Sequence, residues 1–87
     1  MADLRAILNY ISKDNPQAAQ RFVTKLKERC FFLASAPESG TVRDDLVLGL
    51  RAFTVGNYVI YFRSERGGVR VERVLHGAQD VDALIFD

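Results

Sequence analysis

The stretch from Leu50 to His76 limits the possible folds more than any other part of this sequence. It contains short runs rich in valine, isoleucine, tyrosine and phenylalanine, divided by two pairs of turn residues, Gly56-Asn57 and Gly67-Gly68. Glycine readily adopts the positive φ that two-residue hairpin turns require. The pattern therefore predicts a three-stranded antiparallel meander. Its strands are expected over about residues 50–55, 58–64 and 69–75.

The turns also predict which side chains share a face of this sheet. With Gly56-Asn57 as a two-residue loop, Val55 lies opposite Tyr58, and opposed residues point to the same side. If the second loop is also even-numbered, one face, which we call face A, is bulky and apolar and should be the core face. Face A then carries Phe53, Val55, Tyr58, Ile60, Phe62, Val69, Val71, Arg73 and Leu75. Arg73 fits this set poorly and is expected near an edge, extending towards solvent.

The opposite face, face B, mixes apolar and charged side chains. Its expected members are Leu50, Ala52, Thr54, Val59, Tyr61, Arg63, Arg70, Glu72, Val74 and His76. Arg63 is expected opposite Glu72, as a cross-strand ion pair. The apolar content of face B predicts that a partner, a substrate or another part of the chain covers it. An odd-numbered second loop would instead turn the third strand over and move His76 to face A.

Two helices are predicted ahead of the sheet. Apolar residues follow helical spacing over residues 3–13 and again over residues 16–35. In the second helix, Cys30 is expected to be a small core residue. Phe31 and Phe32 are expected to pack on the sheet or on the next loop. Asn15 can cap the second helix and Pro16 suits its first turn. The short break predicts an antiparallel helical hairpin.

The remaining segments are a loop and a tail. The loop runs from Ala36-Pro37 to about Leu50, and its apolar residues are expected to fold back as anchors: Leu46, Val47, Leu48 and Leu50. The tail after Gly77 is expected to dock on the body or to enter an interface through Val81, Leu84, Ile85 and Phe86. The predicted fold is a single α+β domain over residues 1–87, with the helical hairpin on face A of a three-stranded antiparallel sheet, face B open, and a short C-terminal tail.

Composition excludes several classes of function. The chain has 87 residues, with 12 lysines and arginines against 11 aspartates and glutamates, a formal charge of +1. This balance argues against nucleic-acid binding driven by bulk charge, and we expect no sequence-specific DNA binding by this chain. One cysteine and one histidine leave no disulfide framework and no cysteine or multi-histidine metal site, so neither a metal nor a cofactor is expected. With no signal pattern and no apolar run of membrane-spanning length, a cytoplasmic protein without a membrane partner is expected.

Four segments, taken in order, resemble a known family. They are DLRAILNYISKDNPQAAQRFV, APESGTVRDDLVLGLRAF, VGNYVIYFR and VERVLHGAQDVDAL. Together they cover nearly the whole chain and are similar to the ParE branch of the RelE/ParE superfamily, the toxins of type II toxin–antitoxin modules. The resemblance implies the same helical hairpin on an antiparallel sheet.

The resemblance also implies partners. ParE-like toxins poison DNA gyrase, whereas RelE-like relatives cleave messenger RNA on the ribosome. A cognate antitoxin, ParD-like in the ParE branch, holds the toxin inactive. Family members usually begin with a β-strand before the first helix. Because this sequence starts almost at the helix, we expect backbone groups to be unpaired along one sheet edge. An unpaired edge would favour a partner strand there. It would also put the stability of the isolated chain and its full toxicity in question.

Three functions remain open from the sequence. The first is a gyrase-directed toxin that acts by binding, has no catalytic residue, and stabilises a plasmid or chromosome through its module. The second is a ribosome-dependent endoribonuclease. Arg63 and His76 resemble, in strand position, residues that RelE-like nucleases use, which implies that Arg63 would hold phosphate and His76 would act as acid or base, with Glu72 as a possible base. The third is a shortened, inactive homologue that only binds antitoxin. The sequence lacks the C-terminal catalytic tyrosine of those nucleases and is nearly neutral in charge, and both features favour the first.

Partner contacts are expected on face B, at the sheet edge and in the tail. The candidates are Leu50, Arg51, Val59, Tyr61, Arg63, Arg70, Val74, Val81, Leu84, Ile85 and Phe86. Arginine and aromatic side chains commonly dominate protein interfaces.

Overall fold

A computed structural model describes residues 2–77, with side chains from Leu4 onward. The chain forms two helices and then a sheet. The elements are α1 (Ala2–Asp14), α2 (Pro16–Ser35), the 3-10 turn η1 (Pro37–Ser39), β1 (Thr41–Val42), β2 (Arg51–Val55), β3 (Tyr58–Glu65) and β4 (Gly68–His76). The strands are antiparallel neighbours in the order β1-β2-β3-β4. The predicted α+β architecture is confirmed, with one more strand than expected.

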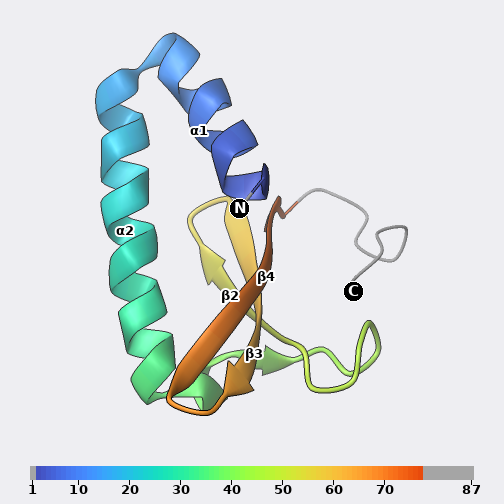
Figure 1. The fold of residues 1–87 in the computed structure, drawn as a ribbon. Helices are drawn as coiled ribbons and strands as arrows, with labels where there is room; N and C mark the ends of the chain where they lie inside the picture. The colour runs from blue at the N-terminus through green and yellow to red at the C-terminus, as the bar shows by residue number, and fades with distance from the viewer. Residues whose placement is uncertain (1, 78–87) are drawn as a thin grey trace.

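The helical hairpin turns at Asn15, as the sequence predicts. The Asn15 side chain accepts a hydrogen bond of 3.1 Å from the Ala18 amide, and Pro16 occupies the first position of α2. The Asn15 amide in turn donates to the Ile11 carbonyl at 2.9 Å, which closes the end of α1. One residue thus ends one helix and caps the next, so the two helices pack side by side (Figure 1).

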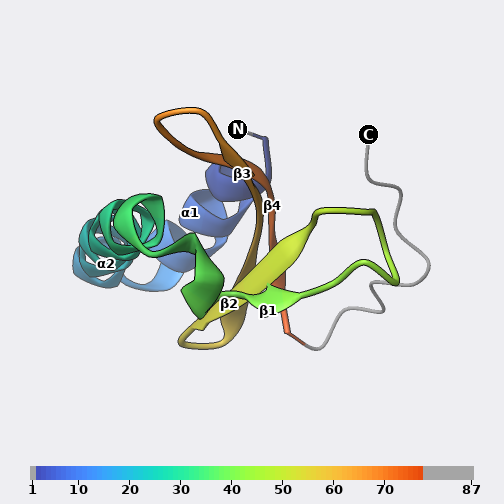
Figure 2. The same ribbon diagram turned by 90° about the horizontal axis from the view of Figure 1, so that it is seen from below.

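The helices cover one face of the sheet, and the loop between β1 and β2 lies on the other (Figure 2). Between helices and sheet, the main core is formed by Leu26, Leu33, Val55, Ile60, Phe62 and Val74. A second, smaller core on the loop side is formed by Leu50, Tyr61 and Leu75, with Leu46, Val47, Ala52 and Val59 packed against it. The chain's own loop therefore covers the apolar part of face B, which confirms the expectation that another part of the chain could cover it, and face B is not open as the predicted architecture had it.

The sheet begins with a strand that the sequence did not reveal. Thr41 pairs with Ala52 and Val42 pairs with Arg51, which makes β1 an edge strand of two residues inside the predicted loop. Two residues are too few to show the alternation by which strands are recognised in a sequence.

The first hairpin has the predicted register and the second does not. Val55 pairs with Tyr58 across Gly56-Asn57, and Gly56 has φ +60°. The second turn is Arg66-Gly67, because Glu65 pairs with Gly68 and Gly67 takes φ +84°. The turn thus lies one residue earlier than predicted.

A β-bulge then changes the face of the last residues of β4. Phe62 pairs with Val71 and Tyr61 pairs with Arg73, so Glu72 has no partner of its own in β3. Beyond it, Val74 pairs with Ile60, and residue 76 pairs with residue 58. The predicted faces are correct for Val69 and Val71 and wrong for the residues after the bulge. Val74 and His76 lie on face A, and Arg73 and Leu75 lie on face B.

Candidate functional site

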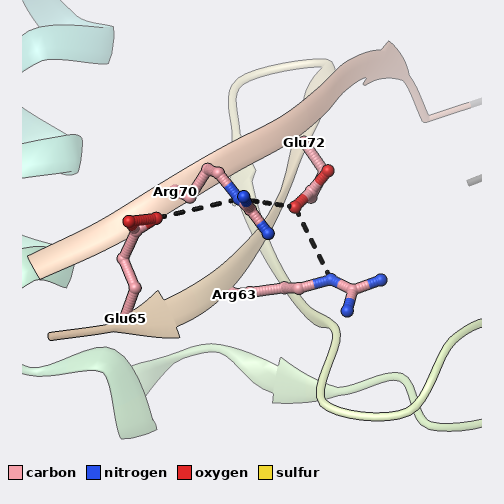
Figure 3. Close-up of polar contacts among 4 residues, drawn as sticks. All are labelled: Arg63, Glu65, Arg70 and Glu72. Atoms are coloured by element: carbon pink, nitrogen blue, oxygen red, sulfur yellow. Dashed lines mark hydrogen bonds and ion pairs between the residues drawn. The ribbon is translucent and has the colours of Figure 1, made fainter. Parts of the chain in front are cut away.

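Four charged side chains meet at the hairpin end of β3 and β4 (Figure 3). Arg63 lies directly opposite Arg70 in the sheet, and Glu72 lies between their guanidinium groups. The Arg70 Nε donates to the Glu72 Oε1 at 3.0 Å, and the Arg63 Nε faces the same oxygen at 3.5 Å. Glu65 approaches Arg70 at 3.7 Å. The predicted ion pair between Arg63 and Glu72 is present, although the two residues are not directly opposed.

Glu72 holds two like charges together at this place. Arginines paired across a sheet repel each other, and a shared carboxylate offsets that repulsion. The Glu72 side chain is only 17% exposed, whereas Glu65 is 50% exposed, so solvent screens the Glu65 contact more strongly. The Arg63 Nε is buried and lacks a hydrogen bond of good geometry, while its terminal nitrogens extend away from Glu72 (Figure 3).

Arg63 and His76 do not share a site. Arg63 lies on face B at the hairpin end of the sheet, and His76 lies on face A at the other end of β4. Six residues of extended strand, roughly 20 Å, separate His76 from the position opposite Arg63. The His76 ring contacts Tyr58 edge-on, with ring centroids 5.4 Å apart. The predicted register, which put both residues on face B, is therefore wrong for His76, and the two cannot act on one phosphate in this arrangement.

The loop between β1 and β2 is a compact, hydrogen-bonded unit. The Arg43 amide donates to the Leu50 carbonyl at 2.8 Å, and the Gly49 amide donates to the Asp44 Oδ1 at 2.8 Å. The Arg43 guanidinium donates two hydrogen bonds to the Asp45 carboxylate, and these bonds hold the pKa of Asp45 below its usual range. The loop backbone is thus fixed at several points, which favours a defined shape at its tip.

Leu48 projects from this loop into solvent. Its side chain is 81% exposed, so the prediction that it folds back with Leu46, Val47 and Leu50 is wrong for Leu48 and confirmed for the other three. Leu48 lines a shallow hollow of about 260 Å³ together with the half-exposed Val42 and with Arg51. The Arg51 guanidinium donates to the Gly40 carbonyl at 3.0 Å, which fixes its direction. Sequence reasoning missed this patch because three apolar neighbours of Leu48 do pack inward.

Several of the predicted partner-binding residues are buried within the chain. Leu50, Tyr61 and Val74 are each no more than 3% exposed, so their side chains belong to the two cores. Val59 is partly buried under the loop. Arg51, Arg63 and Arg70 retain exposed surface, and the tail residues Val81, Leu84, Ile85 and Phe86 lie outside the described residues.

An apolar groove of about 460 Å³ runs between α2 and β4. The side of α2 contributes Leu26, Cys30 and Phe31, and the sheet contributes Ile60 and Val71. Phe31 is 79% exposed, so its prediction as a packed residue is wrong, whereas Phe32 contacts Phe53 with ring centroids 6.1 Å apart. Cys30 is half-buried at the groove, and this burial raises the pKa of its thiol.

Within residues 2–77, no three histidine, cysteine, aspartate or glutamate side chains gather closely enough to hold a metal ion. Across the same residues, neither helix has the length and apolar character needed to cross a bilayer.

Comparison with known proteins finds related sequences. The sequence matches the family model described as ParE toxin of type II toxin-antitoxin system, parDE, over residues 1–81. It is 37% identical over 79 residues to the protein named Toxin RelE2 of Caulobacter vibrioides, an alignment that covers 91% of this chain and 88% of that protein. Modules of this type pair each toxin with an antitoxin. The chain described here belongs to the ParE family of toxins of type II toxin–antitoxin systems.

Proposed function

We propose that this toxin inhibits DNA gyrase by binding to it and performs no RNA chemistry of its own. The observation that carries the proposal is the separation of Arg63 and His76 on opposite faces and at opposite ends of the sheet. Cleavage of RNA needs a base, an acid and positive charge around one phosphate. A toxin that acts by binding needs only an interface. Inhibition of gyrase in the cytoplasm would therefore require no catalytic group of this chain.

The patch of Val42, Leu48 and Arg51 is the surface that we assign to gyrase. Two exposed apolar side chains adjoin an arginine there, in one hollow at the β1 edge of the sheet. The loop that carries Leu48 is already held by backbone hydrogen bonds and by Asp44. A preorganised loop loses little conformational entropy on binding, which favours affinity.

The test is a supercoiling assay with purified gyrase, titrated with this protein and then with the antitoxin encoded beside it. We expect loss of supercoiling and accumulation of cleaved DNA, both reversed by the antitoxin. The matched negative control is the same titration on a type I topoisomerase, which should be unaffected. No effect on gyrase from folded protein that still binds its antitoxin would overturn the proposal. Cleavage of mRNA on ribosomes would then identify an RNA target, and its absence would identify an inert homologue.

A further inference from the structure

Three basic side chains form a line along one exposed flank of α2. Arg21, Lys25 and Arg29, which we call the α2 stripe, follow each other at intervals of four residues, and all three are exposed. Residues four apart lie on one side of a helix, with a rise of about 6 Å between them. The stripe therefore presents three positive charges over roughly 12 Å of the helix.

The positive charge of this chain is concentrated on α2. The helix carries four lysines and arginines and one glutamate, Glu28, a formal charge of +3, whereas the whole chain of 87 residues carries +1. The near-neutral total thus conceals one basic helix. Basic residues aligned along a helix are a feature of proteins that bind polyanions.

The stripe has no partner within the part of the chain that the structure describes. In residues 4–77, the side chains of Arg21, Lys25 and Arg29 form no hydrogen bond or ion pair. The arginines of β3 and β4 differ, because they share the carboxylate of Glu72. Like charges four residues apart on a helix repel each other, and an external anion would relieve that repulsion.

The side chains beside the stripe favour a nucleic acid over a protein as the partner. They line a hollow on the outer side of α2, formed by Gln17, Gln20, Arg21, Thr24, Lys25 and Glu28. All six are polar or charged, whereas protein interfaces are commonly organised around aromatic or other large anchors. Arginine, lysine, glutamine and threonine are the side chains that contact phosphate and sugar in protein–DNA complexes. Glu28 is the one group of this hollow that would repel a phosphate.

The stripe lies beside the strand that carries part of the gyrase surface proposed above. Phe32 follows Arg29 by three residues on this flank of α2, and its ring lies 6.1 Å from that of Phe53 in β2. Arg51 of the gyrase surface lies two residues before Phe53 in the same strand. A partner seated on that surface is therefore close to the stripe.

We propose that the α2 stripe binds the phosphate backbone of duplex DNA, without reading its sequence, while the toxin sits on gyrase. Gyrase acts on duplex DNA, so this is the polyanion that the target holds. One DNA strand carries a phosphate about every 3.4 Å along the axis, so roughly 12 Å of backbone offers three to four phosphates to the three cations. The DNA contact is a property of the stripe itself, whereas its place in a gyrase complex rests on the proposed function.

The test variant removes the charges of the stripe and keeps the helix. It combines Arg21→Gln, Lys25→Gln and Arg29→Gln. Glutamine has a high helix propensity, and the loss of like-charge repulsion should leave α2 at least as stable, which urea denaturation checks. The matched control makes the same change in net charge at three exposed positions on α1 or on the other flank of α2. It combines Arg5→Gln, Lys13→Gln and Lys27→Gln.

The first measurement uses DNA alone. Binding to a fluorescent duplex of about 20 base pairs is followed by anisotropy between about 50 and 200 mM salt. Three phosphate contacts predict a slope of about −2.7 in log affinity against log salt, a loss of roughly fortyfold over this range. The control should keep this slope, and the stripe variant should bring it close to zero. A wild-type slope near zero, or equal slopes for the two variants, would overturn the inference. RNA duplex bound at least about tenfold more tightly than DNA would overturn the assignment to DNA.

The second measurement places the contact in the gyrase complex. The affinity of labelled toxin is compared for gyrase alone and for gyrase with bound duplex. We expect DNA to strengthen binding of the wild type and the control about tenfold, and to leave the stripe variant unchanged. Equal affinities of the wild type for the two forms of gyrase would overturn the inference. A wild type that binds DNA with the expected slope but does not bind gyrase would refute the proposed target and retain the DNA contact.

Discussion

Gly40 lies against the ring of Phe62, and a Cβ atom at position 40 would be 2.5 Å from the Phe62 Cζ and 3.2 Å from the Arg51 Cβ. Phe62 is fully buried and cannot move aside easily. We therefore expect Gly40→Ala to reduce the free energy of unfolding by about 1–3 kcal/mol, measured by urea denaturation. Gly68→Ala is the control, because a Cβ there meets no atom within 4 Å. Equal stability of the two variants would contradict the packing described here.

Glu72 should matter more to stability than Glu65. Glu72→Gln removes the charge shared by the opposed Arg63 and Arg70, and we expect a loss of about 1 kcal/mol in urea denaturation. Glu65→Gln breaks only an exposed contact of 3.7 Å and should change stability by no more than about 0.3 kcal/mol. If Glu65→Gln were the more damaging change, Glu72 would not be the residue that holds the cluster together.

Leu48 should matter to gyrase inhibition and Phe31 should not. Their side chains are almost equally exposed, so truncation of either should leave stability nearly unchanged. Leu48→Ala should weaken gyrase inhibition about tenfold, whereas Phe31→Ala, the matched control, should leave it unchanged. The readouts are the supercoiling assay and urea denaturation. Equal inhibition by the two variants would contradict the assignment of Leu48 to the gyrase surface.

Removal of His76 should leave toxicity largely intact. In a toxin that acts by binding, His76→Ala removes an edge-on contact with Tyr58 and no group that inhibition needs. Growth inhibition and gyrase inhibition should then fall by less than about threefold. Arg63→Ala is measured in the same two assays, as a test of the exposed guanidinium. Complete loss of toxicity in a folded His76→Ala variant at unchanged expression would be strong evidence for the nuclease.

The loop between β1 and β2 should loosen in acid. The hydrogen bonds from Arg43 lower the pKa of Asp45 relative to the unfolded chain. A lowered pKa means that the contribution of this contact is complete above the ordinary carboxyl pKa and is lost as the pH falls through the lowered value. Amide NMR shifts of Leu46 and Val47 should follow that titration. An Asp45→Asn variant should show no such step, and a step that persists in it would assign the transition to another carboxylate.

The sequence predicts the elements of this fold well because each has a local cause. Helical spacing and the Asn15-Pro16 break define the hairpin, and Gly56 defines the first turn and the register of β2 against β3. These signals depend on residues close together in the chain. The second turn was misplaced by one residue because Gly67 and Gly68 both suit a turn, and only Gly67 has a positive φ.

The candidate site was harder to predict, since it depends on features with no signature in composition. The bulge at Glu72 carries no glycine or proline, yet it decides which face Val74 and His76 occupy. The direction of Leu48 depends on how its loop folds over Tyr61 and Leu75, which are distant in the sequence. The pairing of Arg63 with Glu72 was predicted correctly, because the two opposite charges lie close together in the predicted register and in the observed one.

The bulge also makes Glu72 a natural position for insertion or deletion in this sheet. Since Glu72 has no partner in β3, its removal would leave every residue pair of the β3–β4 hairpin as it is. The core under the helices takes Val74 from one side of that position and Val69 and Val71 from the other. A deletion there therefore removes the carboxylate that Arg63 and Arg70 share, while the apolar residues of β4 keep their pairing and their faces.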